Sequence, residues 1–141
     1  MQFVLDVIPL NEKLLGFSNR WYPAAMKSST GQRLSDDIEI RMITAPFFLA
    51  TKLEAFKGRG NGDFFGSRDL EDFVSVVDGR AAIVQEVQDT AELQAYIPAE
   101  TKRLLATTGF LDALPGYLLP DAASQSRITI VLQRLQELAS L

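Results

Sequence analysis

Residues 52–72, KLEAFKGRGNGDFFGSRDLED, decide how the chain is arranged. They predict a helix, a glycine-rich loop over residues 58–63 and a second helix, because glycine at this density does not continue a helix. Ser67 is a favourable N-cap for the second helix. The apolar residues of that helix follow at i, i+3, i+4 and i+7, which predicts one buried stripe: Leu70, Phe73, Val74 and Val77.

Charged residues accompany both predicted helices. Lys52 and Arg59 share a face if the first helix reaches Arg59, and Asp69 and Asp72 lie side by side on the polar flank of the second. A structural interpretation explains them all. Asp69 favours a helix N-terminus, Arg68 pairs with Asp72 across one turn, and the stem of Lys52 rests on the core. A functional interpretation gathers the same cations and carboxylates into one site.

Composition narrows the chemistry. The 141 residues, 47% of them hydrophobic and nine of them Phe, predict one domain with a substantial core. The absence of Cys and His excludes disulfides, thiolate chemistry, Ser-His-Asp hydrolysis and His-ligated zinc. Any metal must therefore be held by oxygen ligands, which favours Mg²⁺, Mn²⁺ or Ca²⁺. A net charge of −4 without charge blocks argues against general nucleic-acid affinity and leaves a local basic patch open.

The hydropathy pattern predicts a soluble cytoplasmic protein that does not enter the membrane. No apolar run reaches the roughly 20 residues that a membrane helix requires. The first residues also lack the basic region and apolar stretch of a signal peptide.

Residues 2–8, QFVLDVI, predict a buried strand that ends at Pro9. Asp6 interrupts this strand, and a buried carboxylate requires a cation, a hydrogen-bond donor or a metal. Asp6 therefore either ends the strand against a basic neighbour or serves a functional site.

The remaining chain predicts one further strand and otherwise mostly helix. Residues 37–43 alternate between polar and apolar, which is typical of a half-exposed strand. Asp37 and Glu39 on it superficially resemble a D-x-D metal pair, but an exposed strand face explains them at no cost and is the favoured interpretation. Residues 28–35 are expected to form a polar turn, and Pro98 is expected to stop or kink a helix. Helices are expected at residues 19–27, 80–88, 91–97, 100–109 (with Gly109 as C-cap) and 126–141.

The order of motifs resembles bacterial AbiEii-type nucleotidyltransferase-like proteins of abortive-infection and type IV toxin–antitoxin systems. The resemblance covers essentially the whole chain. Its most specific part is a Lys-x-x-Ala-Phe-x-x-Arg helix followed by Arg-Asp-x-x-Asp, which here are Lys52, Ala55, Phe56, Arg59, Arg68, Asp69 and Asp72. The implied fold is α+β: a truncated polymerase-beta-like nucleotidyltransferase fold with a small mixed sheet and a mostly helical C-terminal half.

The resemblance also implies roles for individual residues. Asp6 matches the third metal-binding carboxylate of such enzymes, so it would hold Mg²⁺. Lys52 and Arg59, with Arg68, would contact the nucleotide phosphates, and Asp69 and Asp72 would complete the catalytic pocket. Phosphoryl transfer requires cations where phosphate charge develops, which agrees with these residue types. The implied partners are a nucleoside triphosphate, a tRNA or protein acceptor and an antitoxin.

The chain departs from the family pattern ahead of Asp6. It lacks the Gly-Ser loop and the D-x-D pair that precede the third carboxylate, so residues 1–141 are expected to be one partial domain that is inactive alone. The alternative is a non-catalytic remnant that acts as a binding or oligomerising scaffold, with homo-oligomers formed through the N-terminal strand.

Overall fold

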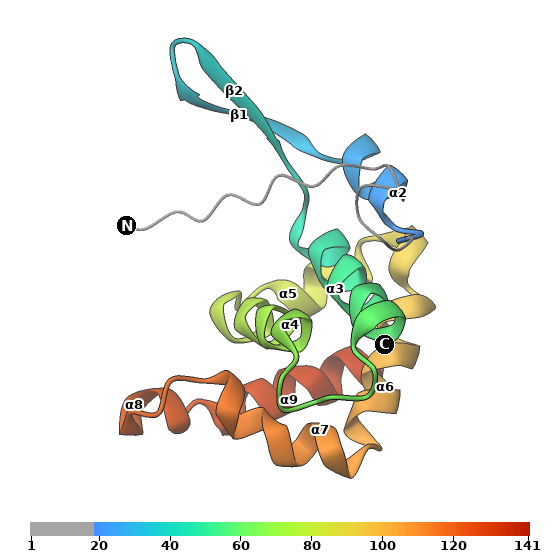
Figure 1. The fold of residues 1–141 in the computed structure, drawn as a ribbon. Coiled ribbons are helices and arrows are strands. Elements are labelled where there is room, and N and C mark those ends of the chain that lie inside the picture. Colours follow the sequence, from blue (N-terminus) through green and yellow to red (C-terminus); the bar gives the residue numbers. More distant parts are fainter. Residues whose placement is uncertain (1–18) are drawn as a thin grey trace.

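The computed structural model of the protein describes residues 19–141 (Figure 1). The predicted strand at residues 2–8, and Asp6 within it, lie outside the described residues. The first elements are α2 (Tyr22–Lys27), β1 (Thr30–Ser35) and β2 (Ile38–Met42). The central pair is α3 (Ala45–Arg59) and α4 (Arg68–Gly79). The elements that follow are α5 (Ile83–Gln88), η1 (Ala91–Leu93), α6 (Tyr96–Leu105), α7 (Thr108–Ala113), η2 (Leu114–Tyr117), α8 (Ala122–Gln125) and α9 (Ile128–Ala139).

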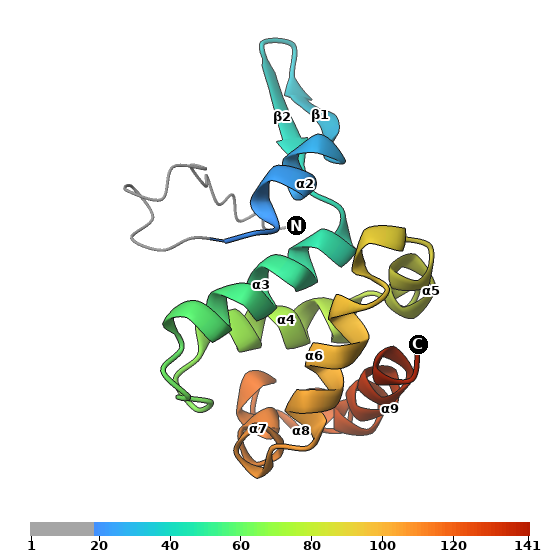
Figure 2. The same cartoon turned by 90° about the vertical axis from the view of Figure 1, so that its right-hand side faces the viewer.

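Helix α3 runs through the middle of the helical body (Figure 2). It contacts α2, α4, α5 and α6, so it is buried around most of its circumference. Helix α9 closes the other side by packing on α6, α4 and α5. The described helices share one hydrophobic core, whose largest fully buried side chains include Phe73, Phe110, Leu49, Leu70 and Ile83.

Strands β1 and β2 form an antiparallel hairpin that projects away from the helices (Figures 1 and 2). Thr30 pairs with Met42 at its base and Ser35 with Ile38 at its tip, with an irregularity in β1 between Arg33 and Ser35. Every strand residue except the half-buried Ile40 is exposed. The coarse prediction of an α+β chain with a helical C-terminal half is therefore confirmed.

The structure confirms the local predictions that rest on clear helical periodicity. Ser67 caps α4, and the stripe that begins at Leu70 is fully buried. Helix α9 buries Val131, Leu135 and Leu138, as its amphipathic pattern predicted.

Several predicted boundaries are wrong. Residues 30–35 form a strand and not a turn, because they pair with β2 directly across the short turn that follows them. Pro98 lies in the first turn of α6, where its missing N–H has no helical acceptor to lose. The helix after it ends at Leu105, and Gly109 lies inside α7. Residues 80–82 form a turn that separates α4 from α5. Among the described residues, no helix is long and apolar enough to cross a membrane.

Candidate functional site

The candidate site lies where α3 meets α4, and local sequence sets both helix ends. Helix α3 continues through Gly58 and ends at Arg59, so its last two residues lie in the predicted loop. The chain then reverses through Asn61 and Gly62, whose φ angles of +51° and +72° are left-handed, a conformation that Gly and Asn adopt most readily. The Oγ of Ser67 accepts a hydrogen bond from the Leu70 amide at 3.1 Å and so begins α4.

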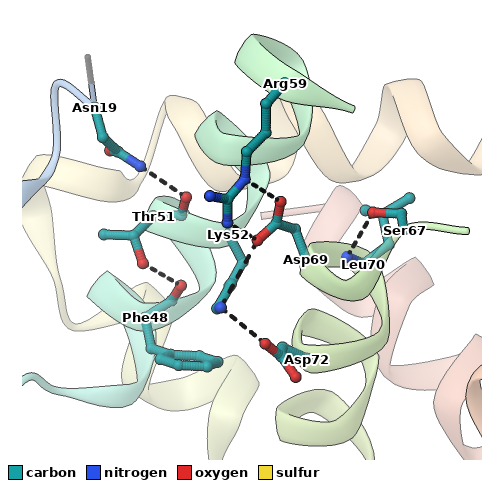
Figure 3. A network of polar contacts seen from close by, with 9 residues as sticks. All are labelled: Asn19, Phe48, Thr51, Lys52, Arg59, Ser67, Asp69, Leu70 and Asp72. Atoms are coloured by element: carbon teal, nitrogen blue, oxygen red, sulfur yellow. Dashed lines mark hydrogen bonds and ion pairs between the residues drawn. The ribbon is translucent and has the colours of Figure 1, made fainter. Parts of the chain in front are cut away.

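Four charged side chains of the two helices meet in one cluster (Figure 3). The Asp69 carboxylate accepts two hydrogen bonds from the Arg59 guanidinium, at 3.0 Å from Nε and 2.8 Å from Nη2. The Nζ of Lys52 lies 2.8 Å from Asp72 and 3.7 Å from Asp69. We call Lys52, Arg59, Asp69 and Asp72 the α3–α4 charge cluster. The cluster joins the two helices through a bidentate pair, Arg59 with Asp69, and a single ion pair, Lys52 with Asp72.

Burial is uneven across the α3–α4 charge cluster. The side chains of Asp69 and Lys52 are 8% and 14% exposed, whereas those of Asp72 and Arg59 are 36% and 52% exposed. Asp69 was predicted on the polar flank of α4, but Arg59 reaches across from α3 and supplies the partner that makes its burial tolerable. The predicted pair of Arg68 with Asp72 is replaced by the pair of Lys52 with Asp72.

The neighbouring polar and aromatic groups fix the position of Lys52. Its Nζ lies 5.3 Å from the centre of the Phe48 ring, a cation–π distance. The carbonyl of the preceding residue, Thr51, accepts a hydrogen bond of 2.9 Å from the Asn19 side-chain amide (Figure 3). Sequence reasoning offers no signal for this contact of Asn19, because a lone Asn before a short helix predicts only a cap.

Tyr22 lies within the electrostatic field of the same cluster. Burial raises the pKa of its phenol above the ordinary value, and the positive charges of Arg59 and Lys52 oppose that rise. Its neighbour Trp21 is buried, with its ring 4.9 Å from that of Tyr96 and the Arg20 guanidinium 4.6 Å from its centre. Packing on the core therefore explains the presence of Trp21.

An open depression of about 510 Å³ adjoins the α3–α4 charge cluster. It is lined by Arg59 at the end of α3, by Ser67, Arg68 and Asp69 at the start of α4, and by the connecting loop through Gly60, Asn61, Asp63 and Gly66. Backbone amides at a helix start together with arginine side chains are the groups that bind phosphate oxygens.

The structure brings together four of the six predicted site residues: Lys52, Arg59, Asp69 and Asp72. Arg68 lines the depression, and Asp6 lies outside the described residues. Asp37 and Glu39 are exposed on the projecting hairpin and its turn.

The described residues do not by themselves fit a magnesium ion. Within residues 19–141 no group of three or more acidic side chains is placed to hold one. Asp69 and Asp72 both already face cations, so a metal ion there would meet the positive charges of Arg59 and Lys52. Any magnesium ligand set would have to be built on Asp6, and we derive no step through the metal.

The arrangement is charge-balanced as it stands, with two cations against two carboxylates. An incoming anion would have to compete with Asp72 for Lys52 and with Asp69 for Arg59. The first exchange is the easier one, because Asp72 is partly exposed and can be solvated when it is released.

Comparison of the chain with family models, with curated proteins and with solved structures found no match.

Proposed function

We propose that the protein is nucleotidyltransferase-like, and that its family transfers a nucleotide to an acceptor hydroxyl within a type IV toxin–antitoxin system. The observation that supports this most is the meeting of Lys52, Arg59, Asp69 and Asp72 beside an open depression. These residues come from two consecutive helices and belong to the motif on which the resemblance rests. A packing role for each residue alone would not require all four to meet.

In this proposal the depression receives the nucleotide phosphates. Arg68 and Arg59 border it and would contact phosphate oxygens, and Lys52 would join them when its pair with Asp72 opens. Asp69 holds the Arg59 guanidinium in a fixed plane at the border of the depression. Asp72 would return Lys52 to its resting position after the nucleotide leaves.

The described residues do not themselves support the part of the proposal that concerns Mg²⁺ and catalysis. Asp6 would be the metal ligand and, with Lys52, Asp69 and Asp72, would form the catalytic set. The D-x-D pair of the resembled enzymes is missing from the sequence, so we expect the 141-residue chain to bind a nucleotide and not to transfer it alone. The acceptor would be a tRNA or a protein, and an antitoxin would be the regulatory partner.

Ligand-dependent melting tests the binding step. A nucleoside triphosphate with Mg²⁺ should raise Tm, because a ligand that binds only the folded state stabilises it by mass action. Lys52→Met keeps the apolar stem, removes the charge and should reduce the rise. The matched control is Lys57→Met on the same helix, since Lys57 pairs instead with Glu100 at 3.2 Å. Equal rises in both variants and the parent would contradict the role of Lys52.

Transfer itself is tested with a labelled nucleoside triphosphate and a tRNA pool. We expect no label on the tRNA with the purified chain alone. Label that appears on the tRNA and is lost with Asp6→Ala would show that the chain is a complete catalyst and would overturn the expectation of inactivity.

A second candidate is a non-catalytic scaffold that binds a partner or itself. The charge balance of the α3–α4 charge cluster favours the scaffold, because a charge-balanced cluster can join two helices without binding any ligand. Light scattering distinguishes the scaffold by mass: a stable oligomer that shows no response to nucleotides supports it, and a monomer that responds to nucleotides contradicts it.

A further inference from the structure

The hairpin β1–β2 has little support from the rest of the described residues. It projects from the helical body, and neither strand packs extensively on a helix (Figures 1 and 2). A two-stranded hairpin is marginally stable in water at best, and a sheet is generally stabilised by further strands that share an apolar face or by a helix against it. The outer edges of the hairpin are therefore the places to look for an additional strand.

Of the two strands, β2 has the edge that is better suited to pairing. Strand β1 carries the irregularity between Arg33 and Ser35, and a bulge interrupts the row of backbone groups that a neighbouring strand would need. Strand β2 is continuous from Ile38 to Met42 and contains neither proline nor lysine, two residues that protect the edges of sheets. An incoming strand therefore meets a regular ladder at β2.

The apolar residues of β2 lie on one face of the hairpin. Because strand side chains alternate, Ile38, Ile40 and Met42 share this face. The side chains of Ile38 and Met42 are 52% and 51% exposed, and Ile40 is half-buried. The face is thus an apolar strip that the described helices leave largely uncovered.

The opposite face of β2 carries two charges without an ionic partner among residues 19–141. Glu39 lies opposite Arg33 in the register of the hairpin but forms no ion pair with it. The Arg41 guanidinium donates to the Oγ and the carbonyl oxygen of Ser29, both at 2.8 Å. These acceptors are neutral, so they fix the base of the hairpin against the end of α2 and leave the charge of Arg41 unbalanced.

The sequence of β2 is complementary to itself when two copies run antiparallel. A two-fold axis at Ile40 places Ile38 of each copy opposite Met42 of the other, and Glu39 of each opposite Arg41 of the other. Side chains that lie directly opposite share a face of the sheet. This register therefore joins the two apolar strips and forms two cross-strand pairs of opposite charge.

Other registers lose this complementarity. An axis at Glu39 or at Arg41 sets that charge opposite its own copy, and like charges directly opposite each other are destabilising. An axis between two residues sets charged side chains opposite apolar ones, because a shift of one residue moves a side chain to the other face. The register centred on Ile40 is the one that pairs both charges and both apolar strips.

From this self-complementarity we infer that two copies of the chain associate through β2 and form a four-stranded antiparallel sheet with its two-fold axis at Ile40. The contact is short, which places it among small interfaces, so the dimer should dissociate on dilution. The inference does not rest on nucleotide binding, because the α3–α4 charge cluster has no residue on the hairpin. A dimer without a nucleotide response and a monomer with one would thus separate the two proposals.

Charge reversal tests the register by sedimentation of the full chain. Arg41→Glu and Glu39→Arg each set like charges opposite each other twice, so each should raise the dimer dissociation constant at least about tenfold. An equimolar mixture of the two variants restores both opposite-charge pairs in a mixed dimer and should recover the association of the parent. A folding effect within one chain cannot produce this recovery.

Two results of the sedimentation experiment overturn the inference. One is a parent chain that stays monomeric over about a hundredfold range of protein concentration, since dimerisation follows mass action. The other is a mixture that associates no better than either variant alone although both variants keep the Tm of the parent.

Single cysteines locate the axis independently of the charge variants, since the chain contains no cysteine. Ile40→Cys sets two thiols opposite each other with about 4.5–5.5 Å between Cα atoms, within the range of a disulfide. The matched control is Gln32→Cys, which lies beside Ile40 on β1 and is about 14 Å, or three strand spacings, from its copy. With oxidised glutathione, Ile40→Cys should form disulfide-linked dimers at least about tenfold faster than the control. Equal rates overturn the inference.

Discussion

Asp69 is the residue on which the α3–α4 charge cluster depends, and a double-mutant cycle with Arg59 measures that dependence. Asp69→Asn keeps the shape and removes the charge that accepts two guanidinium hydrogen bonds at 2.8 and 3.0 Å. Hydrogen bonds to charged groups contribute about 1.5–3 kcal/mol each, and breaking a fully buried pair costs about 3–5 kcal/mol. Arg59 is 52% exposed and can regain water, so both figures must be reduced.

We expect Asp69→Asn to lower the free energy of unfolding by about 1.5–3 kcal/mol. Arg59→Met should cost less, because the buried carboxylate keeps Lys52 at 3.7 Å. The coupling energy of Arg59 with Asp69 should be about 1–2 kcal/mol, measured by urea denaturation of the parent, both single variants and the double variant. It should fall only modestly at high salt, since one partner of the pair is buried.

The chain contains a comparison pair with a more exposed carboxylate. The Nε of Arg80 donates to both Glu86 oxygens, at 2.7 and 3.0 Å, and the two side chains are 56% and 27% exposed. The cycle of Arg80→Met with Glu86→Gln should give a coupling energy below about 0.5 kcal/mol. Equal coupling energies in the two cycles would refute the argument, because the pair of Arg59 with Asp69 has both the more buried carboxylate and two donor nitrogens.

Three further predictions concern single positions. Phe73→Ala removes a fully buried ring from α4 and should cost about 3–5 kcal/mol in a urea denaturation experiment. Ser67→Ala loses the cap to the Leu70 amide and should cost about 1 kcal/mol, whereas Ser67→Asp should retain most of the stability. Burial raises the pKa of Tyr117 to about 12, so its phenol should titrate in ultraviolet absorbance later than an exposed tyrosine. The folded state favours the neutral phenol of Tyr117. The contribution of Tyr117 to stability is therefore complete below about pH 10 and is lost as the pH rises through about 12. Tyr117→Phe should abolish this pH-dependent loss of stability.

The success of the local predictions has a physical reason in α4 and α9. Each carries its apolar residues at helical spacing, and α4 has a strong cap at Ser67. Those signals lie within a few residues of the elements they specify, so a single sequence is enough to find them. The motif residues Lys52 and Asp69 were predicted in the same way, as members of two neighbouring helices.

Strand β1 and the helix boundaries were harder to predict because their causes lie outside the segments themselves. Strand β1 has no apolar alternation, and its partner β2 supplies the hydrogen bonds that make it a strand. Pro98 is compatible with a helix interruption or a helix start, and only the packing of α6 on the core selects the start.

By itself, the sequence determined that this is a chain without histidine or cysteine chemistry, built around two helices that present matched charges. It determined the capped start of α4 and the buried faces of α4 and α9. Only the tertiary structure decided that Asp69 is buried, that Lys52 pairs with Asp72 and not Arg68, and that the hairpin extends away from the helices. The reason is that periodicity and capping are local properties, whereas the burial and partner of a charge depend on which distant segment lies opposite it.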